Sequence, residues 1–130
     1  MEKTLDTLTS KRITVLGTAF KPNTDDVRDS IAIELIKKLL KKKSRITVYD
    51  PKAMKNTRNI FGEKIIYVGS ITDALNKSQC AVLMTHWKQF ERFNNNSIKH
   101  MSKKFIIDCR RILVEKELQA EYHAIGIGKI

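Results

Sequence analysis

The chain has 130 residues, of which 42% are hydrophobic and 30% are charged, as is typical of a soluble globular protein with a single core. No apolar run reaches the roughly 18 to 20 residues of a membrane span, and residues 1–12 lack the apolar centre of a signal peptide. We therefore expect a cytoplasmic protein with no membrane partner. The 25 Lys and Arg residues outnumber the 14 Asp and Glu residues and give a net charge of +11, which favours anionic partners.

Much of the positive charge lies in residues 37–45, KKLLKKKSR, at the end of a predicted helix. Cations there complement the helix dipole, so a solvated helix end explains the run better than a surface that tracks phosphates. Aromatic residues are sparse and are not interleaved with arginine, as a platform for stacking bases requires. A basic nucleic-acid-binding protein is the least favoured of the functions that we consider.

Neither the cysteines nor the histidines have metal-ligand spacing. Cys80 and Cys109 fall at predicted interior or strand-end positions, and we interpret them as reduced thiols. His100 and His123 have no acid or cysteine at a ligand-like distance along the chain. We expect no metal site.

The first half of the chain predicts three strands separated by helices. Residues 12–17 form a β-branched run that ends in glycine, typical of a buried parallel strand. Residues 45–49 and 64–68 predict the second and third strands, and residues 52–59 a short helix. An amphipathic helix with Asp29 or Ser30 as its N-cap follows the first strand, because apolar residues recur there at helical spacing: Ala32, Leu35, Ile36, Leu39 and Leu40.

The second half continues the alternation. We predict helices over 70–77, 88–93, 96–102 and 115–121, and strands over 80–85, 104–108 and 122–128, the last closed by Gly126 and Gly128. Strands separated by helices pair in parallel through right-handed crossovers. The sequence thus predicts an α/β fold, a Rossmann-like, doubly wound sandwich of three layers around a mostly parallel sheet of six strands.

Ligands of such sheets bind beyond the carboxyl ends of the strands, where the strand order reverses. The loop after the first predicted strand carries Lys21 and Arg28, and the loop after the fifth carries Arg110 and Arg111. These side chains suit phosphate oxygens, and the neighbouring Asp25 and Asp26 would hold the first loop in shape by capping turns and pairing with its cations. The alternative, equally weighted on the residues alone, is that these charges only solvate one another.

Three other polar residues at the strand ends favour structural roles. Asp50 stands where dinucleotide folds bind a ribose hydroxyl, but no glycine fingerprint accompanies it, so we expect a turn with Pro51. His86 and Trp87 follow the fourth predicted strand, and packing in the core or at an interface is the favoured role for both.

Four segments together carry a resemblance to a known family. The segments are VLGTAFKPNTDDVRDS at 15–30, VYDP at 48–51, MTHWKQF at 84–90 and IIDCRRIL at 106–113. In this order they resemble the C-terminal, UDP-binding domain of the UDP-glucose/GDP-mannose 6-dehydrogenase family, and the first looks most like the UDP-glucose dehydrogenases. The resemblance implies a nucleotide-sugar-binding domain over residues 12–130, after a lead-in at 1–11.

The resemblance also implies roles for single residues. Family enzymes oxidise a UDP-sugar at C6 to a carboxylate in two NAD-dependent steps, with NAD bound mainly by a separate N-terminal domain. By position, Phe20, Lys21 and Arg110 match residues of the nucleotide-sugar site. Arg28 matches an arginine that approaches the NAD pyrophosphate. A central segment of family enzymes carries dimerisation, so the implied partners are a UDP-sugar, the rest of the dehydrogenase or a separate NAD domain, and a second subunit.

The sequence departs from the family pattern in ways that limit its chemistry. Ile31 stands where the family usually has proline, and Cys109 where it commonly has glycine. The family's nucleophilic cysteine lies in a central segment that these residues do not match, and no GxGxxG is present, so we expect no catalytic residue here and no dehydrogenase activity from these 130 residues alone. A free-standing UDP or UDP-sugar binding module is the alternative.

Overall fold

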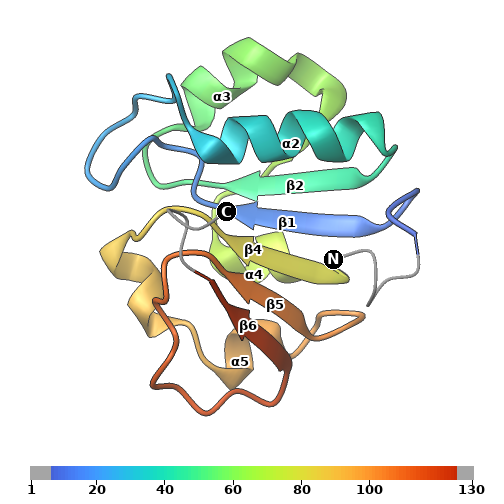
Figure 1. The fold of residues 1–130 in the computed structure, drawn as a ribbon, viewed down its shortest axis with the longest axis vertical. Helices are drawn as coiled ribbons and strands as arrows, with labels where there is room; N and C mark the ends of the chain where they lie inside the picture. The colour runs from blue at the N-terminus through green and yellow to red at the C-terminus, as the bar shows by residue number, and fades with distance from the viewer. Residues whose placement is uncertain (1–6, 126–130) are drawn as a thin grey trace.

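The computed structural model describes residues 7–125, which form a six-stranded sheet in the order β3-β2-β1-β4-β5-β6 (Figure 1). All neighbouring strands pair in parallel, which confirms the predicted Rossmann-like fold. The order reverses between β1 and β4, so the carboxyl ends of these two strands mark the expected ligand edge. The strands are β1 Arg12–Leu16, β2 Arg45–Tyr49, β3 Ile66–Tyr67, β4 Cys80–Leu83, β5 Phe105–Asp108 and β6 Glu121–Ala124.

Helices lie on both faces of the sheet. Helix α4 (Ile71–Leu75) lies behind the sheet in Figure 1, where Thr14 of β1 faces it, and α2 (Ile31–Lys41) covers the opposite face. No helix in the described part of the chain is long and apolar enough to cross a membrane. The remaining helical segments are α3 Met54–Phe61, α5 Asn95–Ile98 and two 3₁₀ turns, η1 Gly62–Lys64 and η2 Lys88–Arg92.

Helix α2 forms as the apolar spacing predicts and packs on the sheet through one face. Its buried residues are Ala32, Ile33, Ile36 and Leu39, with Ile36 fully buried. Full burial of one such side chain stabilises a fold by roughly 2 kcal/mol. Ser30 is the N-cap residue by position, but its hydroxyl donates to the Thr18 carbonyl instead of accepting from the helix, so it ties the helix start to the loop after β1.

Several predicted elements differ in the structure. The predicted helix over 88–93 is the 3₁₀ turn η2, and the one over 96–102 is the four-residue α5. The third strand is only two residues long, because residues 62–64 form the turn η1 and β3 is the outer strand. The predicted helix over 115–121 is absent. The backbone of this segment instead bonds to the side chain of Asn95, which donates to the Glu117 carbonyl and accepts from the Gln119 amide. A segment of seven residues nucleates a helix poorly by itself, so these contacts decide its path. Gly126 and Gly128 lie outside the described residues.

Gly17 allows β1 and β4 to approach each other at the ligand edge. Its backbone has φ +93°, and a Cβ built on it would lie 2.6 Å from the Cβ of Thr85 and 2.7 Å from the Thr85 amide nitrogen. No real Cβ tolerates such contacts, and a side chain is strained at this φ. Glycine is therefore required at the end of β1 for close packing, apart from any contact with a phosphate.

We expect Gly17→Ala to lower the free energy of unfolding by roughly 3 kcal/mol, through overpacking and backbone strain. Gly69→Ala is the matched control, because nothing lies within 4 Å of the Cβ that it adds. It should change stability by less than about 0.5 kcal/mol. Urea unfolding of both variants measures the difference. Equal stabilities would contradict the close approach of Gly17 to Thr85.

Candidate functional site

A buried carboxylate, Asp50, joins three strand ends at the ligand edge. Asp50 follows β2 and is 2% exposed. Its Oδ2 accepts from the amides of Thr18 and Ala19, after β1, at 2.9 and 3.0 Å. The same oxygen accepts from the indole nitrogen of Trp87, after β4, at 2.9 Å. These bonds fix the relative positions of the loops that follow β1, β2 and β4.

The other oxygen of Asp50 shapes the start of the path to α3. Its Oδ1 accepts from the amides of Lys52 and Ala53, both at 2.9 Å. This is the turn that the sequence predicts for Asp50 and Pro51. With five N–H donors, the carboxylate is saturated, so in this structure it has no free lone pair for a ribose hydroxyl.

Hydroxyl groups extend this network on both sides. Thr85 donates to the Ala19 carbonyl at 2.9 Å, and Thr18 shares a hydrogen bond of 2.7 Å with Thr57 of α3. In the described part of the chain no buried side-chain nitrogen or oxygen lacks a partner. A fully satisfied polar network in a dry interior specifies one arrangement of its loops.

The loop over 20–30 is held by Asp26 and Arg28. The guanidinium of Arg28 donates from Nε and Nη2 to the carboxylate of Asp26, at 2.9 to 3.3 Å, and the Arg28 amide also donates to it. These hydrogen bonds lower the pKa of Asp26 from 3.8 to about 2. The predicted pairing of Asp26 with a loop cation is thus present. Arg28 has five N–H groups and uses two in this pair, so three are available to an anion.

A second buried carboxylate organises the loop after β5. Asp108 is fully buried and accepts from the amides of Arg110 and Leu113 and from the hydroxyl of Tyr122. Burial and the hydrogen bond to Asp108 raise the pKa of Tyr122, so this hydroxyl keeps its proton and donates. Asp108 thereby sets the direction in which the chain leaves β5.

Arg110 leaves that loop toward β4. Its Nε donates to the Met84 carbonyl at 3.0 Å. The loop after β1 reaches the next residue of the same segment, because Thr85 bonds to the Ala19 carbonyl. Arg110 and Ala19, the residue before the exposed Phe20, are thus bonded to adjacent residues just after β4.

The structure groups the four predicted site residues unequally. Phe20, the exposed Lys21 and Arg110 belong to segments that converge on residues 84–85. Arg28 lies farther along the loop, where the Asp25 carbonyl accepts from Asn56 of α3, and it borders a hollow shared with that helix. The loops that carry Phe20, Lys21 and Arg110 therefore meet where the strand order reverses. The Phe20 amide also donates to the Asp26 carbonyl at 2.7 Å, which ties the Arg28 end of the first loop to Phe20.

The remaining polar candidates have structural surroundings. Trp87 is buried against Asp50, as the packing interpretation expects, and the exposed His86 contacts Glu91 at 3.1 Å. Cys80 and Cys109 are free and buried. Burial raises the pKa of Cys109 to about 11 and that of Cys80 to about 12, so both remain protonated thiols at neutral pH and are poor nucleophiles.

Sequence reasoning missed the extent of the two carboxylate networks. It assigned Asp50 a local turn and gave Asp108 no role, although both hold loops from distant parts of the chain. The available signal is an Asp at the end of a strongly apolar strand. Such a carboxylate falls in a buried position, where it must find several donors.

The description "UDP-glucose/GDP-mannose dehydrogenase family, UDP binding domain" belongs to the family model that matches residues 14–115. A UDP-glucose 6-dehydrogenase of Haloferax volcanii is 41% identical over 110 residues, which are 85% of this chain and 25% of that protein. A UDP-glucose 6-dehydrogenase of Bacillus subtilis is 33% identical over 120 residues, which are 89% of this chain and 26% of that protein. The chain thus spans about a quarter of the length of these relatives.

Solved structures agree with the sequence comparison. A UDP-glucose dehydrogenase from Pyrobaculum islandicum superposes with a TM-score of 0.79 and 32% identity, over 94% of this chain and 27% of its own. The apo D-lactate dehydrogenase of Escherichia coli, with a TM-score of 0.57 and 16% identity over 79% of this chain and 29% of its own, shares the fold alone.

We expect Asp50→Asn to lower the free energy of unfolding by about 3 kcal/mol or more, because the amide replaces an acceptor with a donor that faces N–H groups. Trp87 is the chain's single tryptophan, so its fluorescence should report the loss of the indole hydrogen bond. Asp25→Asn is the control, since the Asp25 side chain is exposed. If both variants unfold at the same urea concentration, the network around Asp50 does not stabilise the edge.

Proposed function

Since the chain belongs to the UDP-glucose/GDP-mannose dehydrogenase family, as its UDP-binding domain, we propose that the carboxyl edge of its sheet binds the nucleotide part of a UDP-sugar. Residues 12–130 form this domain. Within the whole protein the domain serves a cytoplasmic, NAD-dependent oxidation of UDP-glucose to UDP-glucuronate. The rest of the dehydrogenase, or a separate NAD domain, supplies the cysteine nucleophile and most of the cofactor site.

The meeting of the loops after β1 and β5 at residues 84–85 carries this proposal, because these loops bring Phe20, Lys21 and Arg110 to one edge. Lys21 offers a mobile point charge, and Arg110, anchored through its Nε, still has four N–H groups for phosphate oxygens. Phe20 presents an exposed aromatic ring beside them, suited to the base or the sugar. Side-chain cations thus do at this edge what the backbone N–H groups of a glycine-rich turn do in dinucleotide sites.

In this proposal Arg28 serves the cofactor and not the nucleotide-sugar. Asp26 orients the Arg28 guanidinium, and Arg28 borders a hollow that it shares with α3, which supports the division. Both side chains of the pair are substantially exposed, so a pyrophosphate brought by another domain can reach Arg28. The diphosphate of UDP and that of NAD then approach the loop over 20–30 at two separate points.

We expect isothermal titration calorimetry to show that the chain binds UDP more tightly than ADP. Lys21→Ala and Arg110→Ala should each weaken UDP binding about tenfold, equivalent to about 1.4 kcal/mol, because each removes a cation from the diphosphate. Arg28→Ala and the control Lys55→Ala, an exposed lysine of α3, should stay within about twofold of wild type. No uridine preference, or wild-type binding by both of the first two variants, overturns the assignment.

The 130 residues alone should form no NADH from UDP-glucose and NAD, whatever their affinity for UDP. Absorbance of NADH over a long incubation measures this, with a complete dehydrogenase of the family as the positive control. Steady NADH formation would show that the nucleophile and the cofactor site lie within this chain, contrary to the proposed division of labour.

A further inference from the structure

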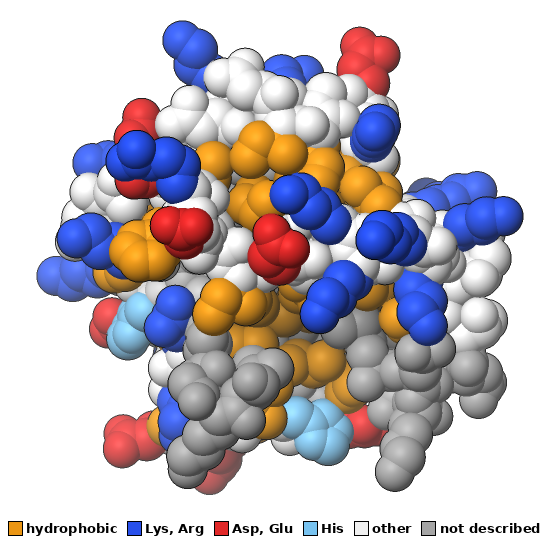
Figure 2. Space-filling model, turned by 45° about the horizontal axis from the view of Figure 1, so that its top comes forward, with side chains coloured by type: hydrophobic (Ala, Val, Ile, Leu, Met, Phe, Trp, Pro, Cys, Tyr) orange, Lys and Arg blue, Asp and Glu red, His pale blue; other side chains and the backbone are white. Residues whose placement is uncertain are grey.

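The positive charge of the protein is concentrated at the edge of the sheet opposite to the nucleotide site. Figure 2 shows Lys and Arg side chains gathered on the right, where the strands begin, and acidic and basic side chains interspersed on the left. At the beginnings of the four central strands, and at the ends of α2 and α5 beside them, lie eight basic residues: Lys11, Arg12, Lys41, Lys43, Arg45, Lys77, Lys99 and Lys104.

Backbone hydrogen bonds join these segments into one surface. The Arg45 amide donates to the Lys11 carbonyl, and the Lys77 amide donates to the His100 carbonyl, both at 2.8 Å. Among the described residues, no ion pair joins any of the eight to a carboxylate. Of the acidic residues near this edge, Glu63 lies in η1 just before β3 and Glu121 is the first residue of β6, so both belong to the two outer strands' side of the surface.

Two of the cations are held side by side. Arg12 and Arg45 are the first residues of β1 and β2, are register partners and are both exposed. The Arg12 backbone is fixed from β4's side, since its amide donates to the Gln79 side chain and its carbonyl accepts from the Gln79 amide. Like charges at paired positions destabilise a sheet. An anion bound between them would remove this cost.

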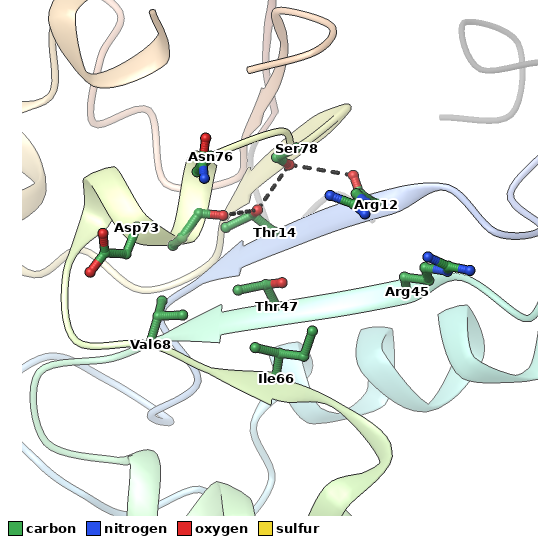
Figure 3. A pocket seen from close by; sticks show the side chains of 10 residues that line it. Arg12, Thr14, Arg45, Thr47, Ile66, Val68, Asp73, Asn76 and Ser78 are labelled. Carbon is green, nitrogen blue, oxygen red and sulfur yellow. Dashed lines mark hydrogen bonds between the residues drawn. The ribbon is translucent and has the colours of Figure 1, made fainter. Parts of the chain in front are cut away.

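A hollow of about 230 Å³ opens beside the two arginines, on the face of the sheet that carries α4 (Figure 3). Thr14 and Ser78 form one wall, and their hydroxyl groups already have partners within the protein. Thr14 donates to the Ala74 carbonyl at 2.6 Å and contacts the Ser78 hydroxyl at 2.8 Å. Thr47 lies on the floor, and its hydroxyl makes no hydrogen bond within the described residues. Ile66, which is 59% exposed, gives the outer side an apolar surface.

The charges of the hollow are arranged along its length. Figure 3 shows Arg12 and Arg45 at one end and Asp73 at the other. No ion pair joins Asp73 to either arginine. A ligand with its anionic group at the arginine end and a hydroxyl-bearing or apolar body along Thr47 and Ile66 would match each part of this lining.

We propose that this hollow is a second anion site, which binds the phosphate of a small phosphomonoester between Arg12 and Arg45. The two guanidinium forks suit phosphate oxygens, and Thr47 offers a hydroxyl donor. The surrounding lysines raise the local concentration of such anions. The phosphomonoester is either a free metabolite or a lipid headgroup. The site is independent of the proposed UDP site, from which the length of the strands separates it.

Glycerol 3-phosphate is a suitable probe, in 0.15 M NaCl so that diffuse charge attraction is screened. Its binding, followed by amide chemical shifts, should move the signals of Arg45 and Thr47 and leave that of Lys21 unchanged, with or without saturating UDP. The double variant Arg12→Gln/Arg45→Gln should bind it at least about tenfold more weakly. Thr47→Val, which keeps the side-chain shape, should weaken it by about threefold.

Lys88→Gln/Lys116→Gln is the matched control, because it removes the same charge from exposed positions at the other edge. It should bind glycerol 3-phosphate as wild type does. The double arginine variant should be at least as stable as wild type, since it removes a like-charge pair. Equal losses in the two double variants, shifts confined to the carboxyl edge, or no binding in wild type overturn the proposal.

Vesicles distinguish the two sources of the phosphate. If a lipid headgroup is the ligand, phosphatidylcholine vesicles that contain phosphatidic acid should bind the protein, and vesicles without it should not. The double variant Arg12→Gln/Arg45→Gln should then lose this binding. Binding of glycerol 3-phosphate without vesicle binding identifies a free metabolite. Duplex DNA binding that both double variants weaken equally, with a steep salt dependence, would show a diffuse polyanion surface in place of the site.

Discussion

The carboxylate of Asp50 is the interaction on which the ligand edge depends. Five N–H groups from three separate loops converge on its two oxygens, at distances of 2.9 to 3.0 Å. A buried charge is tolerable only when it is hydrogen-bonded in this way. The same bonds bring the ends of β1, β2 and β4 together, and they therefore determine where the loop with Phe20 and Lys21 can lie.

Most of the fold follows from local sequence patterns. The strands β1, β2, β4 and β5 and the helix α2 are predictable because each combines a strong apolar pattern with a polar or glycine boundary. The helix prediction for residues 115–121 is wrong, because it rests on composition alone. Hydrogen bonds from the side chain of Asn95, some 20 residues earlier, determine the path of this segment. Local secondary-structure propensity is overridden where residues distant in the sequence form the hydrogen bonds of the backbone.

The site shows the same limit. Lys21, Arg28 and Arg110 can be proposed from the sequence, because cations that follow parallel strands meet at one edge. That Arg110 reaches Met84, or that Trp87 donates to Asp50, depends on contacts between residues 26 and 37 positions apart, which no local pattern encodes. The two charged edges are likewise visible only in three dimensions, because the chain alternates between them at every strand.

Asp50, Asp26 and Asp108 have a common consequence for ligand binding. Each accepts hydrogen bonds from the backbone of a loop and from a side chain, so the edge has its shape before any ligand arrives. A preorganised edge gives up little conformational entropy on association, and more of the gross contact energy then appears as affinity. Changes in these carboxylates would thus affect recognition through the entropy of ordering the loops, although none of the three needs to touch the bound molecule.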